Sequence, residues 1–256
     1  MISKLPHVTT SIFAVMSKMA IDNNALNLSQ GYPNFESDPL LIDLVYQAMK
    51  DGFNQYAPMP GEISLREEIS KKYYNLYNKR YNLDSEITVT AGATQAIFTA
   101  IAATVDNGDE VIIFTPAYDC YQPTVELFGG KTRPIQLKAP DYQIDWDVVS
   151  DTISNKTKLV IINTPHNPSG TILSKTDMEM LQTLVVEHGL YVISDEVYEH
   201  IIFDDQTHYS AALFPELAQR TFITASFGKT FHNTGWKMGY CLAPKTLMQE
   251  FQKVHQ

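Results

Sequence analysis

The sequence predicts an α/β protein built on a mostly parallel β-sheet with helices on both faces. Two observations carry this prediction. Short apolar runs rich in β-branched residues recur along the chain, and longer segments with helical spacing of apolar residues lie between them. This alternation is typical of successive βα units, in which each crossover helix covers a face of the sheet. With 256 residues, of which 44% are hydrophobic, the chain can bury such a core.

The expected strands are five apolar runs. They are "ITVTA" (87–91), "EVIIFTP" (110–116), "KLVIINTP" (158–165), "YVISDEVY" (191–198) and "TFITASF" (221–227). Helices are expected at about 41–52, 63–80, 93–105, 119–129, 174–188 and 245–255. We expect residues 1–30 to form an N-terminal arm with a helix and residues 31–256 to form one large domain, because no repeat, linker or low-complexity tract divides that part of the chain.

Composition argues against several classes of protein. A net charge of −10 does not favour binding to nucleic acid, which needs a basic face. The N-terminal apolar run, residues 12–16, is too short for a signal sequence or a membrane span. Two cysteines, Cys120 and Cys241, offer no disulfide framework, which fits a cytoplasmic protein. The seven histidines show no paired spacing such as HxxxH, so no metal site is expected.

Ligands of parallel sheets collect at the carboxyl ends of the strands, and unusual residues follow the expected strands here. Gly92, Ala93 and Thr94 open a helix whose free N–H groups could bind a phosphate, although a glycine turn with a threonine cap is commoner. Tyr118 could stack on a flat ligand or could belong to the core. Asn167, between two prolines, offers a donor and an acceptor, or simply forms an Asn-Pro turn.

Two further strand ends carry charged residues. Asp195 follows a buried-strand pattern and would need a partner if buried, whereas an exposed aspartate beginning a turn is an equal alternative. Tyr198 lies three residues further on. Lys229, grouped with Ser226 and Lys237, could be a desolvated nucleophile toward carbonyls, although most lysines are solvated on the surface.

A nucleotide-binding P-loop at Lys229 is excluded. Gly228-Lys229-Thr230 has the end of that motif, but the motif needs a glycine five residues before Gly228, and that position is Ile223. Taken together, the strand-end residues describe a ligand with a phosphate, a planar ring, a ring nitrogen that needs an acid, a phenolic oxygen and a carbonyl. That description fits pyridoxal 5′-phosphate bound to a lysine as a Schiff base.

The motifs also resemble those of class I/II (fold-type I) pyridoxal-phosphate-dependent aminotransferases. The matching stretches are "LSQGYPNF" (28–35), "QYAPMPGEISLR" (55–66), "TAGATQAI" (90–97), "TPAYDCY" (115–121), "NTPHNPSG" (163–170), "SDEVYEH" (194–200) and "SFGKTFHNTGWKMGY" (226–240). Within the family, "PAYDCY" and "SFGKTFHNTGWKMGY" most resemble the methionine and kynurenine (glutamine-type) aminotransferases. The implied fold is the large domain of such an enzyme.

The resemblance implies a role for each matched residue. Lys229 would bind the cofactor covalently, and Asp195 would pair with the ring nitrogen. Tyr198 would be the third catalytic residue and would donate a hydrogen bond to the phenolic oxygen of the ring. The remaining cofactor contacts would come from Gly92, Ala93, Thr94, Tyr118, Asn167, Ser226 and Lys237, together with Tyr56 of a second subunit. Gly31 and Asn167 would contact the substrate. Completion of the site by Tyr56 implies a homodimer.

The implied reaction moves an amino group from an L-amino acid (methionine, aromatic or glutamine-like) to a 2-oxo acid with ping-pong kinetics. A cysteine-conjugate β-lyase on the same site, or a cofactor-binding chain without full activity, stays open. Many relatives have arginine where this chain has Lys237, which cannot form a bidentate fork with phosphate. The family's substrate-carboxylate arginine lies in a C-terminal small domain, and no arginine follows Arg220 here, so we expect this chain to lack that domain.

Overall fold

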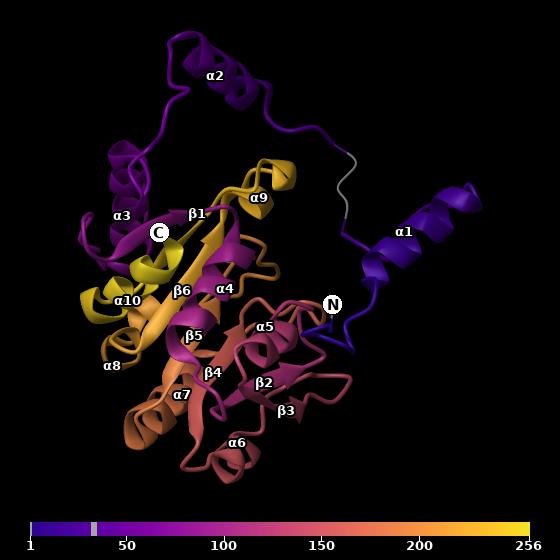
Figure 1. Ribbon diagram of the computed structural model, residues 1–256, viewed down its shortest axis with the longest axis vertical. Coiled ribbons are helices and arrows are strands. Elements are labelled where there is room, and N and C mark those ends of the chain that lie inside the picture. The colour runs from indigo at the N-terminus through magenta and orange to yellow at the C-terminus, as the bar shows by residue number, and fades with distance from the viewer. Residues whose placement is uncertain (1, 32–34) are drawn as a thin grey trace.

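The computed structural model describes residues 2–31 and 35–256. Its centre is a sheet in the order β1-β7-β6-β5-β4-β2-β3 (Figure 1). The strands are β1 Ile87–Thr90, β2 Glu110–Thr115, β3 Lys131–Gln136, β4 Thr157–Asn163, β5 Tyr191–Asp195, β6 Thr221–Ser226 and β7 Gly239–Leu242. Only the pairings of β7 with β1 and with β6 are antiparallel among these strands. The prediction of a mostly parallel sheet is therefore confirmed.

Helices connect the strands and cover the sheet. They are α1 Ile12–Asp22, α2 Pro39–Lys50, α3 Ile63–Tyr77, α4 Ala93–Thr104, α5 Tyr121–Leu127, α6 Trp146–Thr152, α7 Lys175–His188, α8 Pro215–Ala218, α9 Phe227–Thr230 and α10 Lys245–His255, with short 3₁₀ turns η1 Ala211–Leu213 and η2 Thr234–Trp236. All six expected helices are present; α10 has the predicted bounds, and each of the other five differs from them at one or both ends. For example, α3 ends at Tyr77, three residues early, because Asn78 adopts a left-handed conformation with φ 52°.

The sequence patterns did not predict two of the observed strands, and they predicted another strand to be longer than it is. The edge strand β3, "KTRPIQ", is largely exposed and contains Pro134, so it lacks the apolar pattern of a central strand. The four-residue β7 begins at Gly239, near the end of the segment 226–240, and pairs with β1 on one side and with β6 on the other. The run 191–198 is strand only as far as Asp195, after which the chain turns.

The sheet separates two apolar cores because successive strand residues point to opposite faces. Val160 and Ile162 of β4 belong to one core, which α3, α6, α7 and α8 cover. Leu159 and Ile161 belong to the other core, which α4, α5 and α10 cover. The strands are therefore buried on both faces, as their continuous apolar runs predicted.

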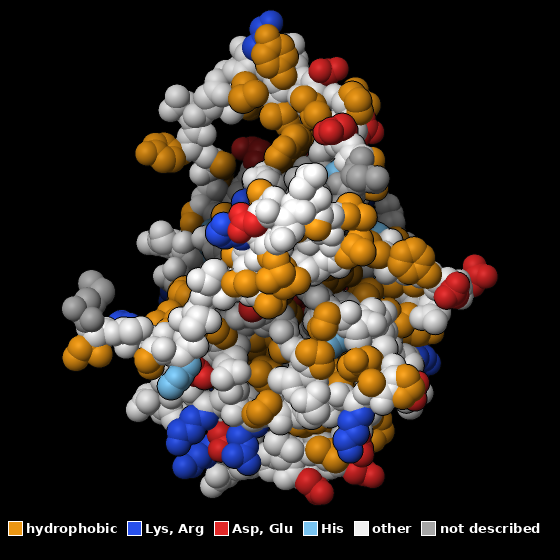
Figure 2. Space-filling model, turned by 90° about the vertical axis from the view of Figure 1, so that its right-hand side faces the viewer, with side chains coloured by type: hydrophobic (Ala, Val, Ile, Leu, Met, Phe, Trp, Pro, Cys, Tyr) orange, Lys and Arg blue, Asp and Glu red, His pale blue; other side chains and the backbone are white. Residues whose placement is uncertain are grey.

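Helices α1 and α2 lie apart from this layered body (Figure 1), and neither contains a buried residue. Their apolar side chains include Ile12, Met19, Leu40 and Tyr46, each more than half exposed. Orange hydrophobic side chains accordingly cover the upper end of the molecule in Figure 2, where α2 lies. Across the ranges 2–31 and 35–256, none of the helices has both the length and the apolar character that crossing a bilayer requires.

Candidate functional site

The five strands that precede the predicted site segments all point the same way. Strands β2, β4, β5 and β6 are joined by parallel pairings, and β1 shares their direction because both β1 and β6 are antiparallel to β7. Their carboxyl ends therefore meet at one edge of the sheet. The structure brings to this edge the segments that begin at Gly92, Tyr118, Asn167, Asp195 and Lys229.

Asp195 is the last residue of β5, and only 3% of its surface is exposed. The hydroxyl of Tyr121 donates a hydrogen bond of 2.6 Å to its Oδ2, and the N–H of Val197 donates one of 3.3 Å to its Oδ1. Burial raises the pKa of Asp195 to about 6, and these two hydrogen bonds oppose the rise. The alternative of an exposed aspartate beginning a turn is excluded.

Asn167 and Tyr198 place two polar groups beside this carboxylate segment. The backbone N–H of Asn167 donates to Oδ1 of Asn163 at 2.7 Å, and Nδ2 of Asn163 donates to the carbonyl oxygen of Asp195 at 2.9 Å. Asn167 in turn approaches the Tyr198 hydroxyl with its Nδ2 at 3.5 Å. The ends of β4 and β5 are thus tied together by side chains as well as by the sheet.

Lys229 lies in α9, the single turn that follows β6. Ser226 caps this turn, because its Oγ accepts a hydrogen bond of 3.1 Å from the N–H of Gly228. The Lys229 Nζ atom lies 5.5 Å from the centre of the Tyr198 ring. Burial lowers the pKa of Lys229, and the positive charge of Lys237 lowers it further. Both effects increase the fraction of neutral, nucleophilic amine.

A second cationic feature lies where α4 begins. Gly92 adopts φ 79° immediately before Ala93, the first residue of this 12-residue helix. A Cβ atom on Gly92 would lie 3.4 Å from Nζ of Lys237, so the ammonium group is next to the helix N-terminus. Gly239 permits the contact between β7 and α4, since its Cβ would lie only 2.7 Å from the backbone N of Ala93. An ammonium group and free helix N–H groups together favour the binding of an anion at this position.

Tyr118 lies between these two groups of residues. Its ring packs edge-on to the ring of Tyr121, with centroids 5.9 Å apart. Burial raises the pKa of Tyr118, and the neighbouring Thr94 side chain opposes that rise. The tyrosine is only partly buried, so part of its ring is accessible to a ligand.

Tyr56 and Gly31 are not brought into this group within one chain. Tyr56 is fully exposed, at 102% of its reference surface, and a Cβ on Gly31 would meet no atom within 4 Å. Of the predicted motif 28–35, the residues Tyr32, Pro33 and Asn34 lie outside the described residues. Among the residues that are described, no cluster of three His, Cys, Asp or Glu side chains could hold a metal ion.

Sequence reasoning missed Tyr121 and Asn163, which contact Asp195 directly. Each has one weak sequence feature that suggests a place near the site. Tyr121 follows Tyr118 by three residues, and Asn163 is a polar residue that ends an otherwise apolar strand. Neither pattern identifies a partner, because the contacts join segments 32 and 74 residues apart in the chain.

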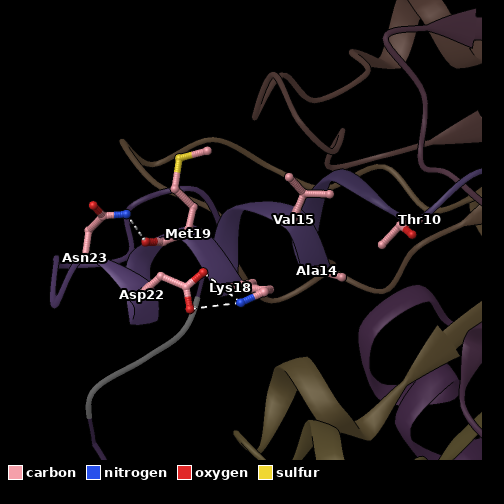
Figure 3. Close-up of a pocket in the computed structure, with 7 residues that line it drawn as sticks. All are labelled: Thr10, Ala14, Val15, Lys18, Met19, Asp22 and Asn23. Atoms are coloured by element: carbon pink, nitrogen blue, oxygen red, sulfur yellow. Dashed lines mark hydrogen bonds and ion pairs between the residues drawn. The ribbon is translucent and has the colours of Figure 1, made fainter.

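Two surface hollows lie outside the strand-end group. One, of about 460 Å³, is lined by residues of α1 and of its two ends, among them the Lys18–Asp22 ion pair (Figure 3). The other, of about 470 Å³, lies between residues 35–39 and residues 230–232. There the rings of Phe35 and His232 are 4.6 Å apart, so this segment approaches the turn that carries Lys229.

Comparisons with known proteins show the family of this chain. Residues 23–256 match the family model "Aminotransferase class I and II". The chain belongs to this family. It is 48% identical over 254 residues to a methionine aminotransferase of Escherichia coli, covering 99% of this chain and 66% of that protein. It is 34% identical over 265 residues to human kynurenine–oxoglutarate transaminase 3, covering 99% of this chain and 58% of that protein.

Solved structures of family members have the same fold. The crystal structure of the E. coli methionine aminotransferase superposes with a TM-score of 0.96 at 47% identity and covers 100% of this chain and 66% of that one. The N-succinyldiaminopimelate aminotransferase of Mycobacterium tuberculosis also gives a TM-score of 0.96, at 35% identity, with 100% and 67% covered. The chain therefore spans about two thirds of the length of these relatives.

Class I and II aminotransferases depend on pyridoxal 5′-phosphate. The strand-end residues of this chain fit that cofactor. A buried carboxylate, a partly desolvated amine and a cation beside a helix N-terminus match its ring nitrogen, its carbonyl and its phosphate respectively.

Proposed function

We propose that the protein of which this chain is part is a pyridoxal-phosphate-dependent aminotransferase that moves an amino group from an L-amino acid to a 2-oxo acid. The observation that carries the proposal is the convergence at one sheet edge of Lys229, Asp195 and the Asn167–Tyr198 pair. An amine with a lowered pKa and a buried, hydrogen-bonded carboxylate at the same sheet edge have little structural purpose of their own. They form the arrangement that this cofactor needs.

The cofactor supplies an aldehyde carbon and a ring that withdraws electrons from the substrate. Asp195 would hold the proton on the ring nitrogen, and its burial would strengthen that ion pair. Asn167 and Tyr198 would donate to the phenolic oxygen, and Tyr118 would stack on the ring. The phosphate would be held by Lys237, the backbone of Gly92 and Ala93, Thr94 and Ser226.

Lys229 would have two tasks. It would first hold the cofactor covalently through Nζ. When it is not bound to the cofactor, the amine would act as the base that accepts the proton from the substrate Cα and as the acid that returns it. The lowered pKa of Lys229 favours the neutral form that can accept this proton. Tyr198, whose ring lies beside the amine, would keep that amine aligned.

Methionine and aromatic or glutamine-like amino acids are the donors that we propose. The proposal is supported by the 48% identity to the E. coli methionine aminotransferase and by the kynurenine transaminases among the relatives. Gly31 and Asn167 would contact the substrate. We also propose a homodimer, because the fully exposed Tyr56 is free to complete a partner's phosphate site. A cytoplasmic location is consistent with two free cysteines.

Reduction with borohydride in the presence of the cofactor tests the assignment. We expect one modified peptide, containing Lys229, in mass mapping; a label on another lysine, or no label, would refute it. An amino-donor screen on the whole protein, which measures the 2-oxo acid released, then tests the activity. Pyruvate release from a cysteine conjugate without amino transfer would indicate a β-lyase instead.

A further inference from the structure

Tyr121 is held rigidly at the start of α5. Its side chain is buried at 3% exposure, and it packs in the core that α4 and α10 cover. The phenol ring therefore has little freedom to turn. Its hydroxyl ends at the Asp195 carboxylate, where the 2.6 Å hydrogen bond is shorter and stronger than a neutral one.

We propose that Tyr121 is a positioning residue, which orients the Asp195 carboxylate and keeps it ionised for the cofactor's ring nitrogen. This inference rests on the proposed function. Tyr121 occupies Oδ2, while among residues 2–31 and 35–256 Oδ1 receives only the longer bond from the Val197 N–H. A carboxylate oxygen accepts two hydrogen bonds, so Oδ1 keeps an acceptor site for a further donor.

The surroundings of Asp195 explain why a donor is needed. The groups that interact with it electrostatically are Tyr118, Cys120 and Tyr121 on the α5 side and Glu196 and Tyr198 on the β5 side. All five are neutral or acidic. Desolvation and Glu196 favour the protonated acid, and hydrogen-bond donors oppose them. A protonated Asp195 could not hold the proton on the ring nitrogen.

The test is the isosteric variant Tyr121→Phe, with Tyr81→Phe as the matched control. Tyr81 is also a buried tyrosine, at 6% exposure, but it belongs to the core on the other face of the sheet. In cofactor-free protein, infrared difference spectra give the carboxyl pKa, and Asp195→Asn identifies the band. We expect Tyr121→Phe to raise the pKa of Asp195 from about 6 to roughly 7 or higher, and the control to leave it unchanged.

A second readout uses the cofactor-loaded protein. If the phenylalanine variant acts through protonation of Asp195, its cofactor affinity falls roughly tenfold at neutral pH and recovers as the pH is raised. A loss caused by misfolding would not recover. Site-specific 3-fluorotyrosine at position 121, a stronger donor in an unchanged shape, should lower the pKa of Asp195 instead.

An unchanged pKa of Asp195 in both Tyr121 variants would overturn the inference. That result differs from a failure of the proposed function, which would appear as absent borohydride trapping in the wild-type chain. The infrared measurement needs no bound cofactor, so the two conclusions are separable.

Discussion

The Lys229 amine nitrogen lies 5.5 Å from the centre of the Tyr198 ring, although the two residues follow different strands. Strands β5 and β6 are neighbours in the sheet, so residues three positions beyond their ends meet over the same edge. The contact shields one side of the amine from water, which contributes to the burial that lowers its pKa. A lysine elsewhere on the exposed surface would stay protonated at neutral pH.

Replacement of Lys229 by alanine should abolish covalent attachment of the cofactor. The half-buried side chain donates no hydrogen bond to another residue in the described part of the chain, so the free energy of unfolding should change by less than about 1 kcal/mol. Loss of the visible absorbance of bound cofactor and of borohydride trapping are the measurements. Lys138→Ala, at an exposed position, is the control and should retain both. Normal trapping in the Lys229 variant would contradict the assignment.

Asp195→Asn should stabilise the cofactor-free protein at neutral pH. The pKa of Asp195 is raised from 3.8 to about 6, so between these values the folded state binds more protons than the unfolded state. Stability from this group therefore falls as the pH rises through that window, by about 3 kcal/mol in total. The asparagine variant lacks this penalty, but it also lacks the charge that the cofactor needs.

Urea unfolding of wild type and Asp195→Asn at several pH values measures the effect. The difference between the two free energies of unfolding should grow in favour of the variant from about pH 4 to pH 6 and then stay constant. Other titrating groups cancel in this difference. A difference that does not change with pH would show that Asp195 titrates normally.

Gly239→Ala should separate β7 from the beginning of α4. The added Cβ would lie 2.7 Å from the backbone N of Ala93 and 2.8 Å from the carbonyl O of Ala225, and backbone atoms cannot move away cheaply. We expect a loss of about 1–3 kcal/mol in the free energy of unfolding, together with weaker cofactor binding. Gly235→Ala is the control, because its Cβ would meet nothing within 4 Å. Equal stability of the two variants would refute the steric argument.

Lys72→Met should destabilise the protein by leaving a buried carboxylate without its cation. The Lys72 Nζ atom lies 2.5 Å from Oε1 of Glu199, whose side chain is only 2% exposed, and it also donates to the Tyr240 hydroxyl at 2.9 Å. Removing one partner of such a pair costs about 3 kcal/mol or more. Chemical unfolding provides the measurement.

The double variant Lys72→Met/Glu199→Gln completes a cycle for this pair. It should be more stable than Lys72→Met alone, because a neutral amide costs less to bury than an unpaired charge. Strictly additive effects would mean that the two groups do not interact. Because Glu199 follows Tyr198 directly, the cycle also reports how firmly that part of the site is anchored.

The sequence alone determined five of the seven described strands, their common direction and the polar segments that follow them. Apolar runs such as 158–165 and the polar residues that follow them, such as Asn167 and Lys229, are local patterns with a physical meaning of their own. Their assignment to one ligand needed only the rule that parallel strands end at a common edge. Strand β3 escaped notice because an edge strand needs no apolar face.

The tertiary structure decided which side chains and backbone groups each polar residue contacts. The sequence left Asp195 equally free to be exposed, and only packing showed it buried against Tyr121, 74 residues away. It also decided that Lys237 reaches the beginning of α4, since Gly92 and Gly239 leave room that no local pattern reports. The burial and the pKa of a group depend on which distant segments exclude water from it. The sequence therefore determines where along the chain these residues occur, and the packed fold determines whether they are charged.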